Sequence, residues 1–212
     1  MKRLISTCVL SLLLIIPSPM VSAAENTTKA RPVNSLLIDS LRQGGYILYV
    51  RHGEASVGED QPDLIFSDCS TQRNLSEEGR RQATALGEAF RRLQIPVQSP
   101  VLASPFCRTR ETAELAFGEG NVQADPFWVR IYHLSGDLTP SEREAVLADL
   151  TSLLEKGPSS GTNKVIVAHS FPRGVGLDEI PNLGIVVVKP RGQGKGYEMI
   201  GRITLPELLN MQ

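Results

Sequence analysis

Short apolar runs and amphipathic segments alternate along most of the chain. Two runs, Tyr46–Val50 and Lys164–Ala168, are almost wholly apolar and too short for helices, which is typical of strands buried on both faces. The segment that begins at Ser76 instead repeats its apolar residues every three or four positions, which predicts a helix with a serine N-cap. The same reasoning predicts helices over residues 35–42, 105–117 and 141–154, and strands over residues 101–103, 185–188 and 197–203.

This alternation of strands and helices predicts the fold class. Strands that alternate with helices form largely parallel sheets covered on both faces, so we expect an α/β fold, a three-layer α/β/α sandwich with a mostly parallel central sheet. The last two predicted strands are separated only by residues 190–196, which are rich in glycine and basic residues. A connection this short favours an antiparallel hairpin at the C-terminus.

The first residues have the three parts of a cleavable secretory signal. Basic residues at positions 2 and 3 precede an apolar run over residues 4–16, and the small residues of Val21–Ala24 follow. The run is shorter than the roughly 20 residues that span a bilayer, so we expect no stable membrane anchor. The sequence therefore predicts a signal peptide over residues 1–23 with cleavage after Ala23 or Ala24, a disordered leader over 24–34, one domain over 35–212, and a secreted or periplasmic mature protein.

Charge and cysteine content narrow the classes of partner. The 22 basic and 23 acidic residues give a net charge of −1 without a basic run, so no nucleic-acid partner is expected. With three histidines and no cysteine pair at ligand spacing, we expect no metal site. Cys69 and Cys107 remain after signal cleavage, and an oxidising compartment allows them to form a disulfide; two free thiols are the alternative.

Basic and nucleophilic side chains follow the predicted strands directly. Arg51 and His52 come after the first buried run, His169 comes after the second, and Arg108 lies near the start of the helix predicted over residues 105–117. Because the carboxyl ends of parallel strands meet at one edge of a sheet, these side chains should converge beside a helix N-terminus, which favours anions. A guanidinium group can donate two parallel hydrogen bonds to two oxygens of one phosphate, and a neutral imidazole can attack phosphorus. The sequence therefore predicts a phosphate site that contains a nucleophile.

Three motifs resemble those of the histidine phosphatase superfamily, also called the phosphoglycerate mutase-like family. They are Arg51-His52-Gly53-Glu54, the segment Ser104–Ala113 and the segment Val165–His169, in the order that the family has them. The resemblance extends over roughly residues 45–202 and implies a phosphoric monoester hydrolase that is independent of metals and needs no cofactor. Its partner would be a small phosphorylated substrate.

The resemblance also implies roles for individual residues. His52 would be the nucleophile and form a phosphohistidine intermediate, while Arg51, Arg108 and His169 would hold the phosphoryl oxygens and stabilise charge in the transition state. Whether Gln72 and Arg73 line the same pocket or a solvated loop is left open by the sequence.

The proton donor for the leaving group is not assigned. Some family members use an aspartate directly after the second histidine, but Ser170 occupies this position, and others use a glutamate that residues 130–138 lack. The remaining candidates are His133, Asp137, Glu142 and Glu54.

Hydrolysis of a small phosphomonoester outside the cytoplasm is the function that this sequence favours. A phosphotransferase or mutase is an alternative, although an exported protein would rarely meet the phosphorylated donors that mutases need. A catalytically silent phosphate-binding module is a second alternative, and the presence of His52 argues against it.

Overall fold

The computed structural model describes residues 33–136 and 138–211 of the chain. The expected signal peptide over residues 1–23 lies outside them, as does the expected leader except for positions 33 and 34, which belong to the first helix. Within the described ranges, no helix combines the length and apolar character that crossing a membrane requires.

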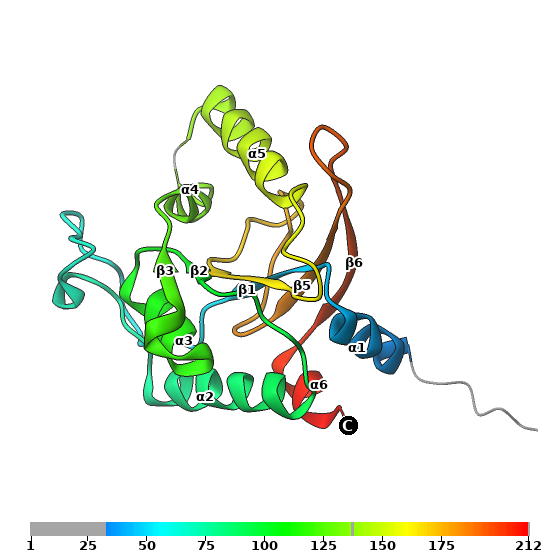
Figure 1. Cartoon of the computed structure of the whole chain (residues 1–212). Helices are drawn as coiled ribbons and strands as arrows, with labels where there is room; N and C mark the ends of the chain where they lie inside the picture. The colour runs from blue at the N-terminus through cyan, green and yellow to red at the C-terminus, as the bar shows by residue number, and fades with distance from the viewer. Residues whose placement is uncertain (1–32, 137, 212) are drawn as a thin grey trace, which may run out of the picture. The chain divides into compact units, whose positions relative to one another are not determined.

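The helices are α1 (Val33–Gln43), α2 (Glu77–Arg92), α3 (Cys107–Phe117), α4 (Phe127–His133), α5 (Pro140–Leu154) and α6 (Leu205–Asn210), with 3₁₀ turns η1 (Cys69–Thr71) and η2 (Glu119–Asn121). The strands are β1 (Ile47–Arg51), β2 (Val101–Ala103), β3 (Val122–Ala124), β4 (Lys164–Ala168), β5 (Ile185–Pro190) and β6 (Tyr197–Ile203). Helices and strands alternate along the first part of the described chain, up to α4; α5 follows α4 directly, and β4, β5 and β6 follow one another (Figure 1).

The strands form one mixed sheet in the order β3-β2-β4-β1-β5-β6. Strands β1, β2, β3 and β4 pair in parallel, and β5 pairs antiparallel with both β1 and β6. The predicted mostly parallel sheet and the predicted C-terminal hairpin are therefore both confirmed. The hairpin extends the sheet at one edge only, so it leaves the parallel strand ends of β1, β2 and β4 together.

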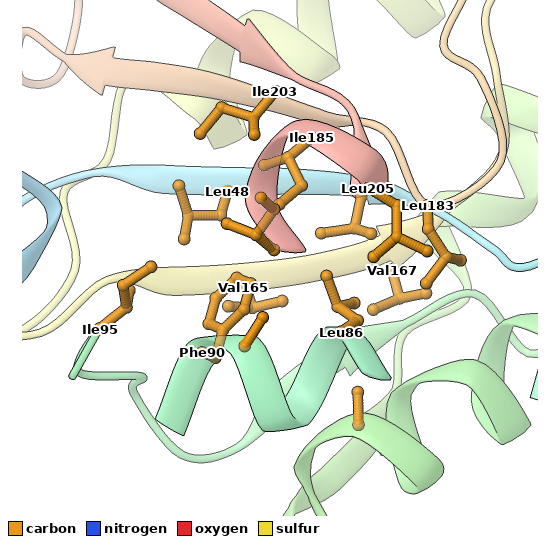
Figure 2. Packing of buried hydrophobic residues seen from close by; sticks show 14 of the residues in the cluster. Leu48, Leu86, Phe90, Ile95, Val165, Val167, Leu183, Ile185, Ile203 and Leu205 are labelled. Atoms are coloured by element: carbon orange, nitrogen blue, oxygen red, sulfur yellow. The ribbon is translucent and has the colours of Figure 1, made fainter. Parts of the chain in front are cut away.

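Two hydrophobic cores lie on opposite faces of the sheet. Leu48 and Val50 of β1 belong to the core that α1, α2, α3 and α6 cover, whereas the alternating residues Ile47 and Tyr49 belong to the core that α4 and α5 cover. Figure 2 shows the first of these cores, with Phe90 of α2 packed beneath the sheet. Since every second residue of the central strand is buried on each face, the three-layer arrangement follows from the apolar run itself.

The connection after β1 lies against the N-terminus of α2. Ser76 caps this helix, because its Oγ accepts a hydrogen bond from the Gly79 N–H at 3.0 Å, and its own N–H donates to the Glu54 carbonyl oxygen at 3.0 Å. A Cβ atom at Gly79 would lie 2.0 Å from the same carbonyl oxygen, so only glycine allows this approach. The predicted serine cap is confirmed, and it fixes the chain immediately after His52.

Candidate active site

The register between β1 and β4 brings the two predicted histidines together. Arg51 pairs with Ala168 at the carboxyl ends of these parallel strands, so His52 and His169 follow at matching positions. The His52 N–H donates to the Ala168 carbonyl oxygen at 3.0 Å, and the two imidazole centroids are 5.6 Å apart. Each histidine is only 4% exposed. The expected convergence at one sheet edge is therefore present.

The His52 ring is held in one orientation and one tautomer. Its Nδ1 lies 2.7 Å from the Gly53 carbonyl oxygen, which can only accept, so Nδ1 carries the proton and Nε2 keeps its lone pair. Burial, followed by the nearby positive charge of Arg108, lowers the pKa of His52 to about 3. The imidazole is consequently neutral at physiological pH, which is the form that can act as a nucleophile.

His169 is fixed by a different set of contacts. Its Nε2 lies 3.0 Å from the Oγ of Ser104, and its carbonyl oxygen accepts a hydrogen bond from the Tyr49 hydroxyl at 2.8 Å. The rings of Phe106 and Tyr132 pack against its imidazole, with centroids 4.8 and 5.2 Å away. Burial, and then electrostatic interactions with His52 and Arg108, lower the pKa of His169 well below its ordinary value, so this ring is neutral as well.

The two predicted arginines reach the same place from different elements. Arg51 ends β1 and donates from Nη1 to the Ile180 carbonyl oxygen at 2.8 Å. Burial, and then the charges of Arg73 and Arg108, lower the pKa of Arg51. Arg108 is the second residue of α3, and its side chain is only 3% exposed. The N-terminus of α3 adds its dipole to these two charges, so the environment favours anions.

All four predicted site residues line one cleft of about 440 Å³. Arg73 lines the cleft with them, which decides the question that the sequence left open for this residue. Gln72 does not line it: its side chain accepts from the Cys107 N–H at 2.8 Å and donates to the Ile65 carbonyl oxygen at 2.9 Å. The cleft therefore holds three guanidinium groups and two neutral imidazoles.

Part of the chain that forms this cleft matches a known protein family. Residues 47–127 match the histidine phosphatase superfamily (branch 1). The match contains the first two of the three motifs, and it confirms the family resemblance over this segment. No curated protein matches the chain.

Solved structures similar to this chain include several phosphatases. Phosphoserine phosphatase from Entamoeba histolytica, in complex with 3-phosphoglyceric acid, is 17% identical with a TM-score of 0.48, over 77% of this chain and 98% of that one. The protein histidine phosphatase SixA, complexed with tungstate, is 15% identical with a TM-score of 0.47, over 77% of this chain and 99% of that one. A mycobacterial glucosyl-3-phosphoglycerate phosphatase is 19% identical with a TM-score of 0.45, over 68% of this chain and 90% of that one.

Asp60 and Tyr132 also line the cleft, and the sequence alone points to neither of them. Asp60, from the connection after β1, accepts hydrogen bonds from Arg108, from the Arg73 N–H and from the Tyr132 hydroxyl. Burial raises the pKa of Asp60, but the hydrogen bonds from Arg108 and Arg73 outweigh this effect and leave the pKa below its ordinary value. Asp60 is therefore a carboxylate at neutral pH. Tyr132 belongs to the short helix α4.

None of the described candidates for the proton donor lines this cleft. Glu54 accepts from the Ser76 hydroxyl at 2.8 Å, close to the start of α2. His133 and Glu142 line a separate cavity of about 250 Å³ beside α4 and α5. Asp137 lies outside the described residues. In the described part of the chain, the carboxyl groups that line the cleft belong to Glu59 and Asp60.

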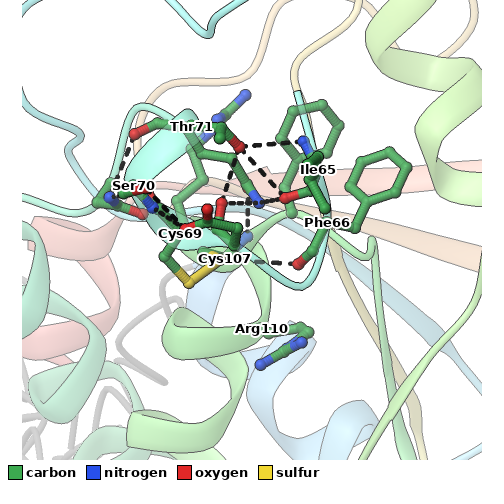
Figure 3. The surroundings of a disulfide bond; sticks show 12 residues. Ile65, Phe66, Cys69, Ser70, Thr71, Cys107 and Arg110 are labelled. Carbon is green, nitrogen blue, oxygen red and sulfur yellow. Dashed lines mark hydrogen bonds between the residues drawn. A yellow bond between two sulfur atoms is a disulfide. The ribbon is translucent and has the colours of Figure 1, made fainter. Parts of the chain in front are cut away.

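The predicted disulfide between Cys69 and Cys107 is present (Figure 3). Cys69 lies in η1, on the connection that carries Asp60, and Cys107 is the first residue of α3, adjacent to Arg108. The bridge joins residues 38 positions apart. A loop of this length corresponds to about 4 kcal/mol on the chain-entropy model, before any strain. It thus fastens the connection to the helix that supplies Arg108.

Potential metal ligands are dispersed in this structure. Over residues 33–136 and 138–211, no group of three or more histidine, cysteine, aspartate or glutamate side chains is arranged to hold a metal ion. The positive charge of the cleft comes from arginine side chains and the N-terminus of α3.

Proposed function

We propose that this protein is a phosphatase that hydrolyses a small phosphomonoester through a phosphohistidine on His52. The observation that carries the proposal is the state of this one imidazole. It is buried and neutral, its Nδ1 is engaged by the Gly53 carbonyl oxygen, and it lines a cleft that three guanidinium groups make positive. A phosphoryl dianion is the ligand that such a cleft attracts most strongly, and it would bring phosphorus to Nε2.

The chemistry follows in two displacements. The Nε2 lone pair of His52 forms the N–P bond while the P–O bond to the leaving alcohol breaks, and the leaving oxygen takes up a proton from a water molecule. A water molecule then attacks phosphorus and gives up a proton to solvent, the N–P bond breaks, and inorganic phosphate leaves with His52 neutral again. Arg51, Arg108 and His169 hold the equatorial oxygens in both steps, and Arg73 adds a further positive charge. Preorganised donors of this kind act chiefly by stabilising transition-state charge.

Export through the N-terminal signal is part of the proposal. The basic start, short apolar run and small residues of positions 2–24 motivate it, and the Cys69–Cys107 disulfide fits an oxidising compartment. We expect protein isolated from outside the cytoplasm to begin at Ala24 or Glu25, and its two cysteines to resist a thiol reagent until reductant is added. Intact-mass measurement with and without reduction checks both. Protein that stays in the cytoplasm and begins at Met1 would contradict export.

Replacing the nucleophile should abolish turnover. We expect His52→Ala to lower kcat for phosphomonoesters by about four orders of magnitude, since no other group supplies the attacking lone pair. His133→Ala is the matched control, because His133 lies in a separate cavity and its loss should leave turnover near that of the wild type. The measurement is steady-state hydrolysis over a panel of phosphomonoesters. A His52→Ala variant that retained roughly a tenth of kcat would exclude this mechanism.

Activity should not depend on a metal ion. The three guanidinium groups in the cleft already supply the positive charge that a two-metal phosphatase takes from its ions. We expect dialysis against a strong chelator to leave kcat and KM unchanged. Loss of turnover on dialysis, followed by recovery with zinc or magnesium, would count against the assignment.

A further inference from the structure

Asp60 and Arg108 form a nearly buried ion pair inside the cleft. Arg108 has a role in the proposed hydrolysis, but Asp60 has none. We propose that Asp60 is a positioning residue: it holds the Arg108 guanidinium by one edge, so that the opposite edge faces the phosphoryl group. The inference rests on the proposed function in that the bound anion is a phosphoryl group.

The hydrogen bonds of Arg108 divide its guanidinium into an occupied edge and an open edge. The edge formed by Nη1 and Nη2 makes a bidentate pair with Asp60, whose Oδ1 lies 2.8 Å from Nη1 and whose Oδ2 lies 3.1 Å from Nη2. Nη1 also donates to the Arg73 carbonyl oxygen at 3.1 Å. A guanidinium is planar and has five N–H groups in a fixed fork, so the edge that remains carries Nε–H and the second hydrogen of Nη2.

The open edge lacks a partner although it is buried. Nε of Arg108 is inaccessible to solvent and makes no hydrogen bond to any residue in the described ranges. A buried donor without a partner costs free energy unless a ligand satisfies it. Nε of Arg51 and Nε of Arg73 are in the same condition, and both residues line the same cleft. One anion with several acceptor oxygens would satisfy these donors together.

Asp60 is itself fixed from three directions. Its side chain is 10% exposed and accepts from the Arg73 N–H at 2.8 Å and from the Tyr132 hydroxyl at 3.0 Å, besides the two bonds from Arg108. The Tyr132 ring in turn packs against the imidazole of His169. Carboxylates held in this way are rigid acceptors, so Asp60 can fix the plane of the guanidinium without a large entropic cost on binding.

A different interpretation of the same contact gives the opposite result. Asp60 could be an internal anion that occupies Arg108 in place of the substrate and must leave before a phosphoryl group binds. In that case removing its charge would strengthen phosphate binding. If Asp60 positions Arg108, removing its charge weakens binding, so the sign of one measured change separates the two interpretations.

The test compares Asp60→Asn with a matched control on the same connection. Asp63→Asn makes the same charge change three positions away, on an exposed side chain that does not line the cleft. We expect Asp60→Asn to weaken binding of inorganic phosphate, measured by titration calorimetry, by about tenfold. Its kcat should fall by a larger factor than its KM rises, because Arg108 acts most strongly on the transition state. Asp63→Asn should change neither phosphate binding nor kinetics.

A double-mutant cycle shows whether Asp60 acts through Arg108. In an Arg108→Ala background, adding Asp60→Asn should cause no further loss of phosphate affinity, since there is no guanidinium left to position. Tyr132→Phe removes one of the donors to Asp60 without a change of charge, and should weaken phosphate binding in the same direction but less. This second variant keeps the test decisive if thermal unfolding shows that Asp60→Asn does not fold.

Three outcomes would overturn the inference: tighter phosphate binding by Asp60→Asn, no change in binding, or an equal loss with and without Arg108. Binding of inorganic phosphate is measured without turnover. A failure of the positioning role can therefore be distinguished from a failure of the proposed function. A wild-type protein that binds phosphate but hydrolyses no ester would refute the function and leave the positioning role intact. If the wild type hydrolyses phosphomonoesters and Asp60→Asn has the same phosphate affinity and kinetics as the wild type, only the positioning role is refuted.

Discussion

The parallel pairing of β1 with β4 is the constraint on which the rest of the site depends. Its register sets Arg51 opposite Ala168, so the residues that follow, His52 and His169, leave the sheet side by side. The hydrogen bond from the His52 N–H to the Ala168 carbonyl oxygen extends the ladder by one residue beyond the strands. A slip of one position would turn one of the two imidazoles toward the opposite face of the sheet.

Charge in the cleft is arranged around this pair of strand ends. Three guanidinium groups lie beside two imidazoles, and burial together with these charges keeps both rings neutral. Asp60 compensates part of the positive charge, and the Cys69–Cys107 disulfide fastens its connection to α3. The cleft therefore favours an anion while the His52 imidazole stays unprotonated, which is the combination that the proposed phosphoryl transfer requires.

The features that could be predicted from the sequence are those with a local signal. The apolar runs of β1 and β4 identify buried strands, and residues that follow buried parallel strands meet at one edge, so the positions of His52 and His169 follow from the amino-acid sequence alone. Strand β3 is only three residues long and largely exposed, and helices α4 and α6 are a turn or two long, so none has a periodic pattern to recognise.

The same limit explains which parts of the site were missed. Asp60 lies in a long polar connection and Tyr132 in the short helix α4, and they meet only because the chain folds both over the ends of the strands. For the proton donor, the sequence left four candidates, because the region in which the family's glutamate is expected contains none. One of them, Glu142, is part of the capping box that starts α5, so this carboxyl group has a local role in the helix.

The central claim is that phosphate is transferred to His52 during turnover. The most direct test is rapid quenching of the working enzyme into base, where phosphohistidine survives, followed by mass mapping of the phosphorylated peptide. The account predicts phosphate on the peptide that contains His52, formed at least as fast as steady-state turnover and absent from His52→Ala. Turnover with no phosphorylated enzyme, or with phosphate on a residue other than His52, would contradict it.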